Sequence, residues 1–303
     1  MFSDVFRTIF AQGFFSSGPV ATALLVGGIA AVVSGVVGAF TVMRGQAFAG
    51  HALADVSAAG GSAAFLLSIS PLLGFLGIGV IAAGGMELIG IRRAQGRDLA
   101  TGVVLGAGLG LAALLLYFDT TVRSTTGVAI TVLFGSMFAI PQATIPLAAA
   151  VSLLVVAIVA VLYRPLLLTT VDPELAFVRG VPYRLVGVLF LIGLALAVAL
   201  SALTIGAILS TALLIGPAAT ALRLSSRPAV AIIGAAVIGV ASTWLGILLA
   251  YDSYYWPPQH HGWPVSFFVV AVIFAGYLLA QAPRASRRTV LSAKPAAPAQ
   301  AEA

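Results

Sequence analysis

The sequence predicts an all-α polytopic membrane protein with about eight to nine transmembrane helices. Only 8% of its 303 residues are charged, and 61% are hydrophobic. No Asp, Glu, Lys or Arg occurs between Arg7 and Arg44, or between Asp55 and Glu87. Apolar runs of this length cross a bilayer as helices, and because they are continuous rather than alternating they disfavour a β-barrel.

Nine apolar segments are expected to cross the bilayer, with eight as the alternative if one of them does not. A further apolar piece, residues 127–140, is short for a span and ends in a proline, so we expect it to be re-entrant or interfacial. In chain order, the expected spans are residues 19–42, 46–67, 71–91, 100–117, 144–163, 185–202, 205–222, 229–250 and 264–281.

The arginines predict the orientation, because cytoplasmic loops of membrane proteins are enriched in Lys and Arg. One set of arginines follows the ends of alternate spans, which places those ends in the cytoplasm. The set is Arg44, Arg92, Arg93, Arg97, Arg164, Arg179, Arg184, Arg223, Arg227, Arg284, Arg287 and Arg288. Residues 1–18 are then an N-terminal interfacial segment and residues 19–281 the transmembrane domain. Residues 282–303 are rich in Ala, Pro and Arg and predict a disordered cytoplasmic tail.

Several chemistries are excluded by composition. The chain has no cysteine, which removes disulfides and thiolate sites. Its single lysine, Lys294, is followed by Pro295, so no GxxxxGK[ST] phosphate-binding loop can form. There is also no HExxH motif. We therefore expect no enzyme, and we expect any ATP hydrolysis to occur in a partner subunit. The charge of +6 comes from arginines in loops and predicts membrane orientation, not nucleic-acid binding.

His51 and Asp55 are ionisable residues inside a predicted span. Such residues are costly at bilayer depth and usually mark a solute path. Their i, i+4 spacing places both on one helix face, and imidazole with carboxylate suits a divalent transition metal. A rise of 1.5 Å per residue puts Asp55 about 16 Å beyond Arg44, near the midplane. The alternative is a polar pair that serves only helix packing.

A short capped helix is predicted between two spans on the arginine-rich side. Asp172 fits the N-cap, Pro173 the first helical position, and Glu174 the positive end of the helix dipole. Gly180 can terminate the helix. The segment is either an ordinary connector or a coupling element for a cytoplasmic partner.

These segments resemble the permease subunits of bacterial zinc/manganese ABC importers over nearly the whole chain. Four motifs carry the resemblance, each modest alone: residues 43–55, 132–136, 172–181 and 213–221. The resemblance implies the ABC importer permease architecture in the bacterial cytoplasmic (inner) membrane. It also implies a second permease subunit, with a homodimer expected, two cytoplasmic ATPase subunits, and an extracytoplasmic metal-binding protein.

By this resemblance, the segment that docks on the ATPase includes Asp172, Glu174, Ala176, Arg179 and Gly180. The transported substrate is expected to be zinc or manganese, with iron as a third candidate, and no cofactor is expected to be bound permanently. One departure concerns the ligands. The family usually has aspartate first and histidine four residues later, whereas here His51 precedes Asp55, which leaves the identity of the ion open.

Two protein ligands are too few for a tetrahedral ion, so backbone carbonyls, water or a second subunit would have to supply the others. Two other functions remain as alternatives. An ABC permease for a metal chelate such as a siderophore would need a wider and less charged path. A proton-coupled secondary carrier would use His51 and Asp55 as a relay and need no ATPase, but no strong inverted repeat supports it.

Overall fold

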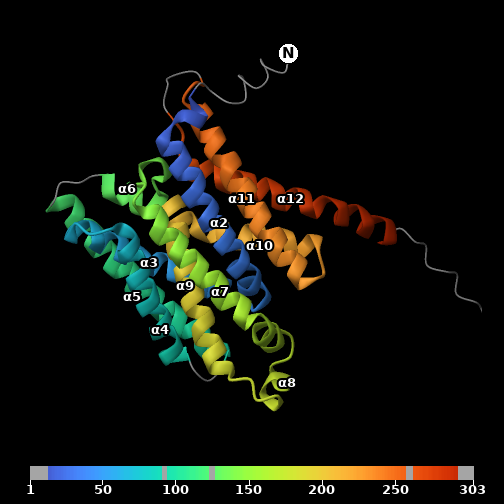
Figure 1. Ribbon diagram of the computed structural model, residues 1–303. Coiled ribbons are helices and arrows are strands. Elements are labelled where there is room, and N and C mark those ends of the chain that lie inside the picture. The colour runs from blue at the N-terminus through green and yellow to red at the C-terminus, as the bar shows by residue number, and fades with distance from the viewer. Residues whose placement is uncertain (1–12, 91–93, 123–126, 257–261, 293–303) are drawn as a thin grey trace, which may run out of the picture.

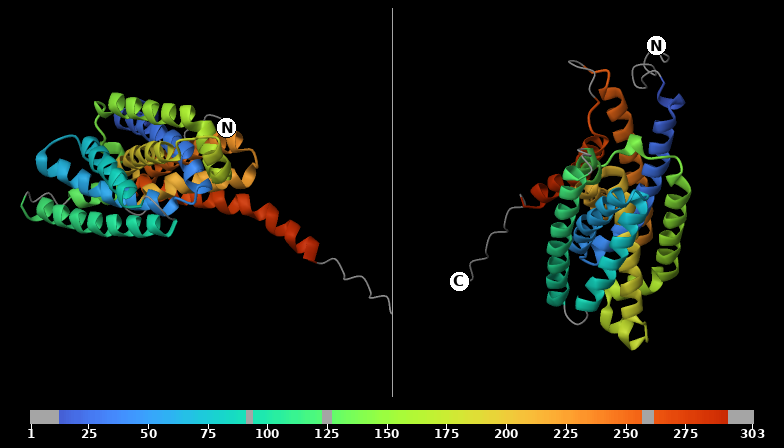
Figure 2. Two further views of the ribbon diagram at one scale, coloured as in Figure 1. Left: turned by 90° about the horizontal axis from the view of Figure 1, so that it is seen from below. Right: turned by 90° about the vertical axis from the view of Figure 1, so that its left-hand side faces the viewer.

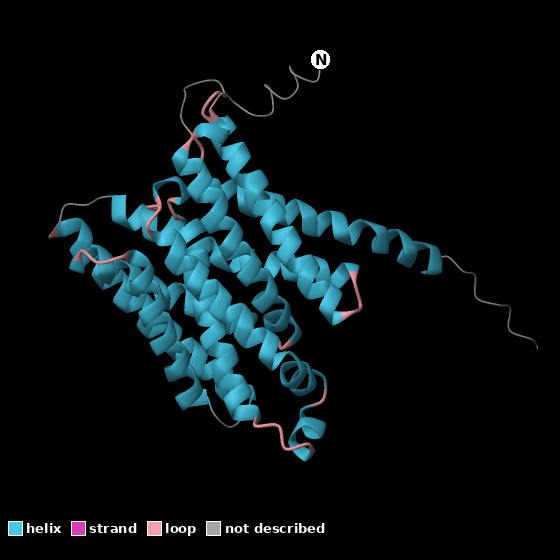
Figure 3. Ribbon diagram, viewed as in Figure 1, coloured by secondary structure: helices cyan, strands magenta, loops and turns pink. Residues whose placement is uncertain are grey.

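The computed structural model describes residues 13–90, 94–122, 127–256 and 262–292, and over these ranges only helices and loops occur (Figures 1 and 3). Two of the elements, η1 and η2, are 3₁₀ turns. In chain order the elements are η1 (Phe14–Ser16), α2 (Gly18–Met43), α3 (Ala47–Leu67), α4 (Pro71–Gly90), α5 (Ala94–Thr121), α6 (Gly127–Phe134), η2 (Met137–Ala139), α7 (Thr144–Val171), α8 (Pro173–Val178), α9 (Tyr183–Ile205), α10 (Ala207–Leu224), α11 (Pro228–Ser253) and α12 (Val265–Ser292).

Eight helices in the described part of the chain are long and apolar enough to cross a membrane: α2, α4, α5, α7, α9, α10, α11 and α12. This agrees with the lower of the two predicted counts. Helix α3, with 21 residues, is not among the eight, since His51, Asp55 and several small residues make it less apolar. It packs instead against α4, α5, α9 and α10, and these neighbours bury Asp55, Ser57 and Ser62.

The core of the bundle lies around α2 and α9, which pack against each other and are both surrounded by other helices (Figure 2). Phe40 of α2 and Phe190 of α9 are fully buried, and their ring centroids lie 6.5 Å apart. The other helices of the core present mainly alanine, glycine and valine. Small residues allow helix backbones to approach closely, which is how helices associate when lipid removes the hydrophobic driving force.

The two ends of the bundle differ in chemistry. At one end, the C-terminal ends of α2 and α7 meet, and α7 leads on to α8 (Figure 1). At the other end, η1 contacts the end of α11 through Phe14 and Tyr251, and Trp256, Trp263 and Phe268 form an aromatic cluster. Arginine at the first end and tryptophan and tyrosine at the second are the distribution expected for a cytoplasmic end and an outer interface.

Helix α7 is longer than predicted. It has 28 residues and contains Pro165, whereas the sequence predicts an end at about residue 163. The helix continues through the proline to Val171. Its length of about 42 Å exceeds the thickness of about 30 Å of the hydrocarbon core. Helix α7 is therefore longer than a bilayer-crossing helix needs to be, and its last turns lead directly to α8.

Residues 127–140 do not form a full span. The eight-residue helix α6 is followed by a turn and by η2, after which α7 begins at Thr144. The turn is fixed where two glycines with positive φ meet, Gly135 (φ 77°) and Gly206 (φ 87°). A Cβ on either one would collide with the backbone of the other loop. This contact locks the short segment onto the turn between α9 and α10.

The terminal segments differ from the prediction where the structure describes them. Helix α12 continues to Ser292, so the first part of the tail predicted to be disordered from residue 282 is helical. Residues 293–303 lie outside the described residues. Of the predicted interfacial segment 1–18, residues 1–12 also lie outside them, and Phe14–Ser16 form a single 3₁₀ turn before α2.

Candidate metal centre

Helix α3 brings the predicted metal ligands together. Nε2 of His51 lies 3.5 Å from Oδ2 of Asp55, as the i, i+4 spacing predicts. The His51 side chain is 44% exposed within this subunit, and that of Asp55 is 11% exposed. The carboxylate is thus held inside the bundle, while the imidazole lies at its margin and is accessible from outside the subunit.

A third residue, Thr211 of α10, contacts the histidine from the other side. Its Oγ1 lies 3.1 Å from Nδ1 of His51. When Nδ1–H donates to Thr211, Nε2 carries the lone pair and faces the Asp55 carboxylate, so both can ligate one cation. When Thr211 donates instead, Nε2–H points towards Asp55. A hydrogen bond at one ring nitrogen commonly fixes which nitrogen of a metal-binding histidine is free.

The position of α10 beside His51 depends on Gly50. A Cβ at this residue would lie 2.7 Å from Cδ2 of Leu214, which is less than van der Waals contact allows. The missing side chain lets α3 and α10 approach closely enough for Thr211 to reach the imidazole. Leu214 is itself fully buried, so it has little room to move away. Gly50 is therefore part of the construction of the site, although it contributes no ligand.

The pair does not form a complete coordination shell by itself. Across the described residues, no group of three or more His, Cys, Asp or Glu side chains is placed to hold a metal ion. His51 and Asp55 supply one nitrogen and one carboxylate, which suit zinc and manganese respectively. The chemistry of the donors fits a divalent transition metal, and the ion would need further ligands from outside this set.

The capped helix that the sequence predicts is confirmed in α8. Leu175 donates its backbone N–H to Oδ1 of Asp172 at 2.9 Å. At the other end, Gly180 donates to the Phe177 carbonyl and Val181 to the Ala176 carbonyl, both at 3.0 Å. These two bonds, with φ 69° at Gly180, form a Schellman motif. Six residues are thereby held as one rigid turn.

Helix α8 presents an apolar surface away from the bundle. Ala176 is fully buried and faces the rest of the protein, while Phe177 and Val178 are 76% and 80% exposed. Glu174 and Arg179 are exposed beside them. Helix α8 is not one of the eight apolar helices of the described residues, and exposed large apolar side chains that gather on one surface mark an interaction site. The sequence predicts this helix but gives no signal for the exposure of its apolar residues.

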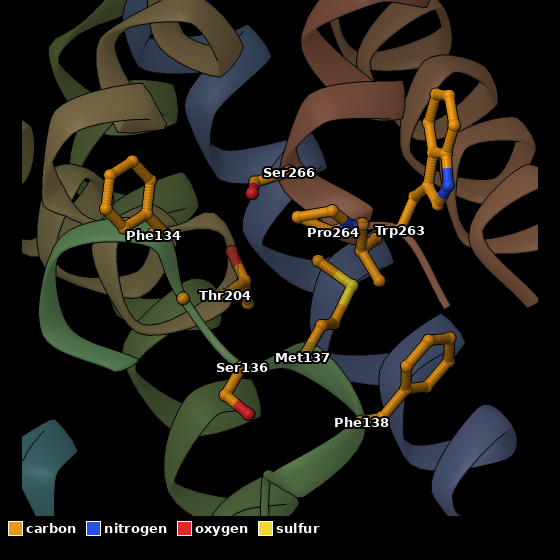
Figure 4. Close-up of a pocket in the computed structure, with 10 residues that line it drawn as sticks. Phe134, Ser136, Met137, Phe138, Thr204, Trp263, Pro264 and Ser266 are labelled. Carbon is orange, nitrogen blue, oxygen red and sulfur yellow. The ribbon is translucent and has the colours of Figure 1, made fainter. Parts of the chain in front are cut away.

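A cavity of about 180 Å³ lies at the outer end of the bundle, between the α6–η2 segment, the end of α9 and the start of α12 (Figure 4). It holds hydroxyl groups and aromatic side chains and no carboxylate or imidazole, so it does not fit a metal ion. The cavity is separate from the His51–Asp55 pair. Its lining residues are Phe134, Gly135, Ser136, Met137, Phe138, Thr204, Trp263, Pro264, Val265 and Ser266.

Comparison with known proteins shows the family. The model of the ABC 3 transport family matches residues 18–277. The manganese transport system membrane protein MntC of Halalkalibacterium halodurans is 32% identical over 74% of this chain and 75% of its own length. The high-affinity zinc uptake system membrane protein ZnuB of Haemophilus influenzae is 28% identical over 76% and 88%, respectively.

The fold is also similar to that of a chain in the PsaBC complex from Streptococcus pneumoniae, solved with a Fab. The TM-score is 0.77 at 22% identity, and the match covers 93% of this chain and 95% of the other. The predicted architecture is thereby confirmed. Together with the eight apolar helices, these comparisons show that the chain is a multi-pass protein of the bacterial inner membrane and belongs to the ABC 3 transport family.

Proposed function

We propose that this chain is the membrane-spanning permease subunit of an ATP-driven importer for a divalent transition metal, with manganese or zinc as the substrate. The observation that carries the proposal is the placement of His51 and Asp55, 3.5 Å apart, on a helix inside the bundle. The names of the relatives, which are membrane proteins of manganese and zinc transport systems, support the same substrate class.

The metal is cargo and is not bound permanently. An ion in transit has to exchange its water for protein ligands and then leave, so an incomplete shell suits transport better than a closed one. Asp55 contributes charge from inside the bundle, and the exposed edge of His51 contributes a nitrogen. The missing ligands come from water, from backbone carbonyls, or from the same pair in a second permease subunit across a two-fold axis.

The partners follow from the two ends of the bundle. Because the sequence allows no phosphate-binding loop, two cytoplasmic ATPase subunits supply the energy. They dock on α8 through Phe177 and Val178, with Glu174 and Arg179 beside them. An extracytoplasmic metal-binding protein delivers the ion at the outer end. The order His51 then Asp55 exchanges imidazole and carboxylate by one helical turn relative to the usual family order, which bears on ion preference.

Replacement of the ligands tests this function directly. His51→Ala and Asp55→Ala should each abolish uptake of manganese and zinc, because each removes one of only two side-chain ligands. The matched control is Ser57→Ala on the same helix. Ser57 has a buried hydroxyl without a hydrogen-bond partner in the described part of the chain, so its loss should leave uptake at the parental rate.

Uptake is measured in proteoliposomes with the ATPase present, and folding is checked by size-exclusion chromatography in detergent. The double variant His51→Asp, Asp55→His should retain some transport with a changed preference between the two ions, since both ligand types are kept. Parental uptake by both alanine variants would refute the site.

Thr211 should contribute through the orientation of the imidazole. Thr211→Val removes the hydroxyl at nearly constant volume and should lower metal affinity by about 10- to 100-fold, as the loss of a hydrogen-bond partner of a metal ligand typically does. Thr211→Ser keeps the hydroxyl and should remain near the parental affinity. Calorimetry with manganese and with zinc on the purified protein measures the difference. Equal affinities for the valine and serine variants would show that the contact does not orient His51.

The coupling helix is tested by pulling down the ATPase. Phe177→Ala should weaken the complex by about 30-fold or more, because truncating a central aromatic anchor of an interface costs roughly 2 kcal/mol or more. Glu174→Ala combined with Arg179→Ala should weaken it as well. Phe274→Ala in α12 is the control, since Phe274 is similarly exposed at 61% but lies in a membrane-spanning helix. Unchanged co-purification of the Phe177 variant would place the docking surface elsewhere.

A further inference from the structure

The guanidinium of Arg44 joins two segments that are far apart in the sequence. Its Nη1 donates to Oγ1 of Thr169 at 2.9 Å and lies 3.4 Å from Oγ1 of Thr170. The same group lies over the ring of Phe190, 5.3 Å from the centroid. One side chain at the end of α2 therefore contacts both the last turn of α7 and the core helix α9.

Arg44 itself lies in the tight connection between α2 and α3. Gly45 (φ 65°) donates to the Val42 carbonyl at 3.2 Å, and Gln46 donates to the Thr41 carbonyl at 2.9 Å. These bonds form a Schellman motif, and α3 begins directly afterwards at Ala47. His51 follows about one turn later. Only Gly45 and Gln46 separate Arg44 from the first residue of the helix that carries His51 and Asp55.

On the other side, the two threonines are fixed to α7. Both hydroxyls donate to the Leu166 carbonyl, at 3.1 and 2.6 Å, so their oxygens are oriented to accept from Arg44. Asp172, the N-cap of α8, comes two residues after Thr170, and α8 packs on α7. The turn that Arg44 contacts is therefore joined to the N-cap of α8 through a single intervening residue, Val171.

We propose that Arg44 is a positioning residue that passes movement of α8, through Thr169 and Thr170, to the start of α3 and so to His51 and Asp55. The inference rests on the proposed function, because it assigns a mechanical route between the ATPase-docking helix and the metal ligands. An arginine at a membrane edge often serves only as an interfacial anchor. That role needs only a charged head group in water, whereas this guanidinium makes directed bonds to two hydroxyls and stacks on an aromatic face.

The test compares transport with ATP hydrolysis in the assembled complex, using manganese as the ion. Arg44→Lys keeps the charge and loses the planar fork, and Thr169→Val with Thr170→Val removes only the two acceptors. Each change should lower the number of ions moved per ATP hydrolysed by roughly fivefold or more, a typical size for coupling between two sites. Assembly, basal ATP hydrolysis and metal binding by the permease should persist.

The combined variant, with all three substitutions, should be no worse than either part, because all of them break the same link. Arg164→Lys is the control, since Arg164 is an exposed arginine on the same helix as the threonines, and its ratio should equal the parental one. The threonine variant keeps the test decisive if Arg44→Lys fails to fold.

A parental ratio in the threonine variant overturns the inference, and so do strictly additive losses in the combined variant. If His51→Ala abolishes uptake while the Arg44 and threonine variants keep the parental ratio, the proposed function stands and this inference falls. A parental complex that moves neither manganese nor zinc would refute both the proposed function and this inference.

Discussion

The cost of placing an imidazole and a carboxylate inside a bilayer constrains this structure more than any other feature. In lipid, backbone polar groups have to be satisfied within the protein, and ionisable side chains need a polar partner or a protein surround. Helix α3 meets both demands. Its backbone bonds are internal, its neighbours α4, α5, α9 and α10 cover it, and Asp55 faces His51 at 3.5 Å. The surrounding apolar helices separate α3 from lipid and so lower the free-energy cost of placing these two side chains there.

Close packing by small residues follows from the same constraint. Gly50 admits Leu214 beside the metal ligands, and this approach brings Thr211 within 3.1 Å of His51. The candidate site is thus built by two helices, one that carries the proposed ligands and one that contacts the imidazole. The incomplete shell that results fits an ion that must be released, and it leaves one edge of His51 accessible to water or to a second subunit.

The sequence predicts local features of this molecule well. The i, i+4 spacing of His51 and Asp55 predicts their contact, and Asp172 and Gly180 predict both caps of α8, because each depends only on neighbours within a turn. Contacts between distant segments have no such signal. Thr211 lies 160 residues from His51, and Thr169 lies 125 residues from Arg44. The sequence does not predict that α7 continues past Pro165 or that α12 continues to Ser292, because proline and a polar composition usually indicate the end of a helix.

The central claim is that His51 and Asp55 hold the ion in transit. The most direct test is the position of manganese in the assembled transporter, located by its anomalous X-ray scattering. The claim predicts a peak between Nε2 of His51 and a carboxylate oxygen of Asp55, with both atoms at bonding distance from the ion. A peak at another place in the bundle, with none between these two residues, would contradict it.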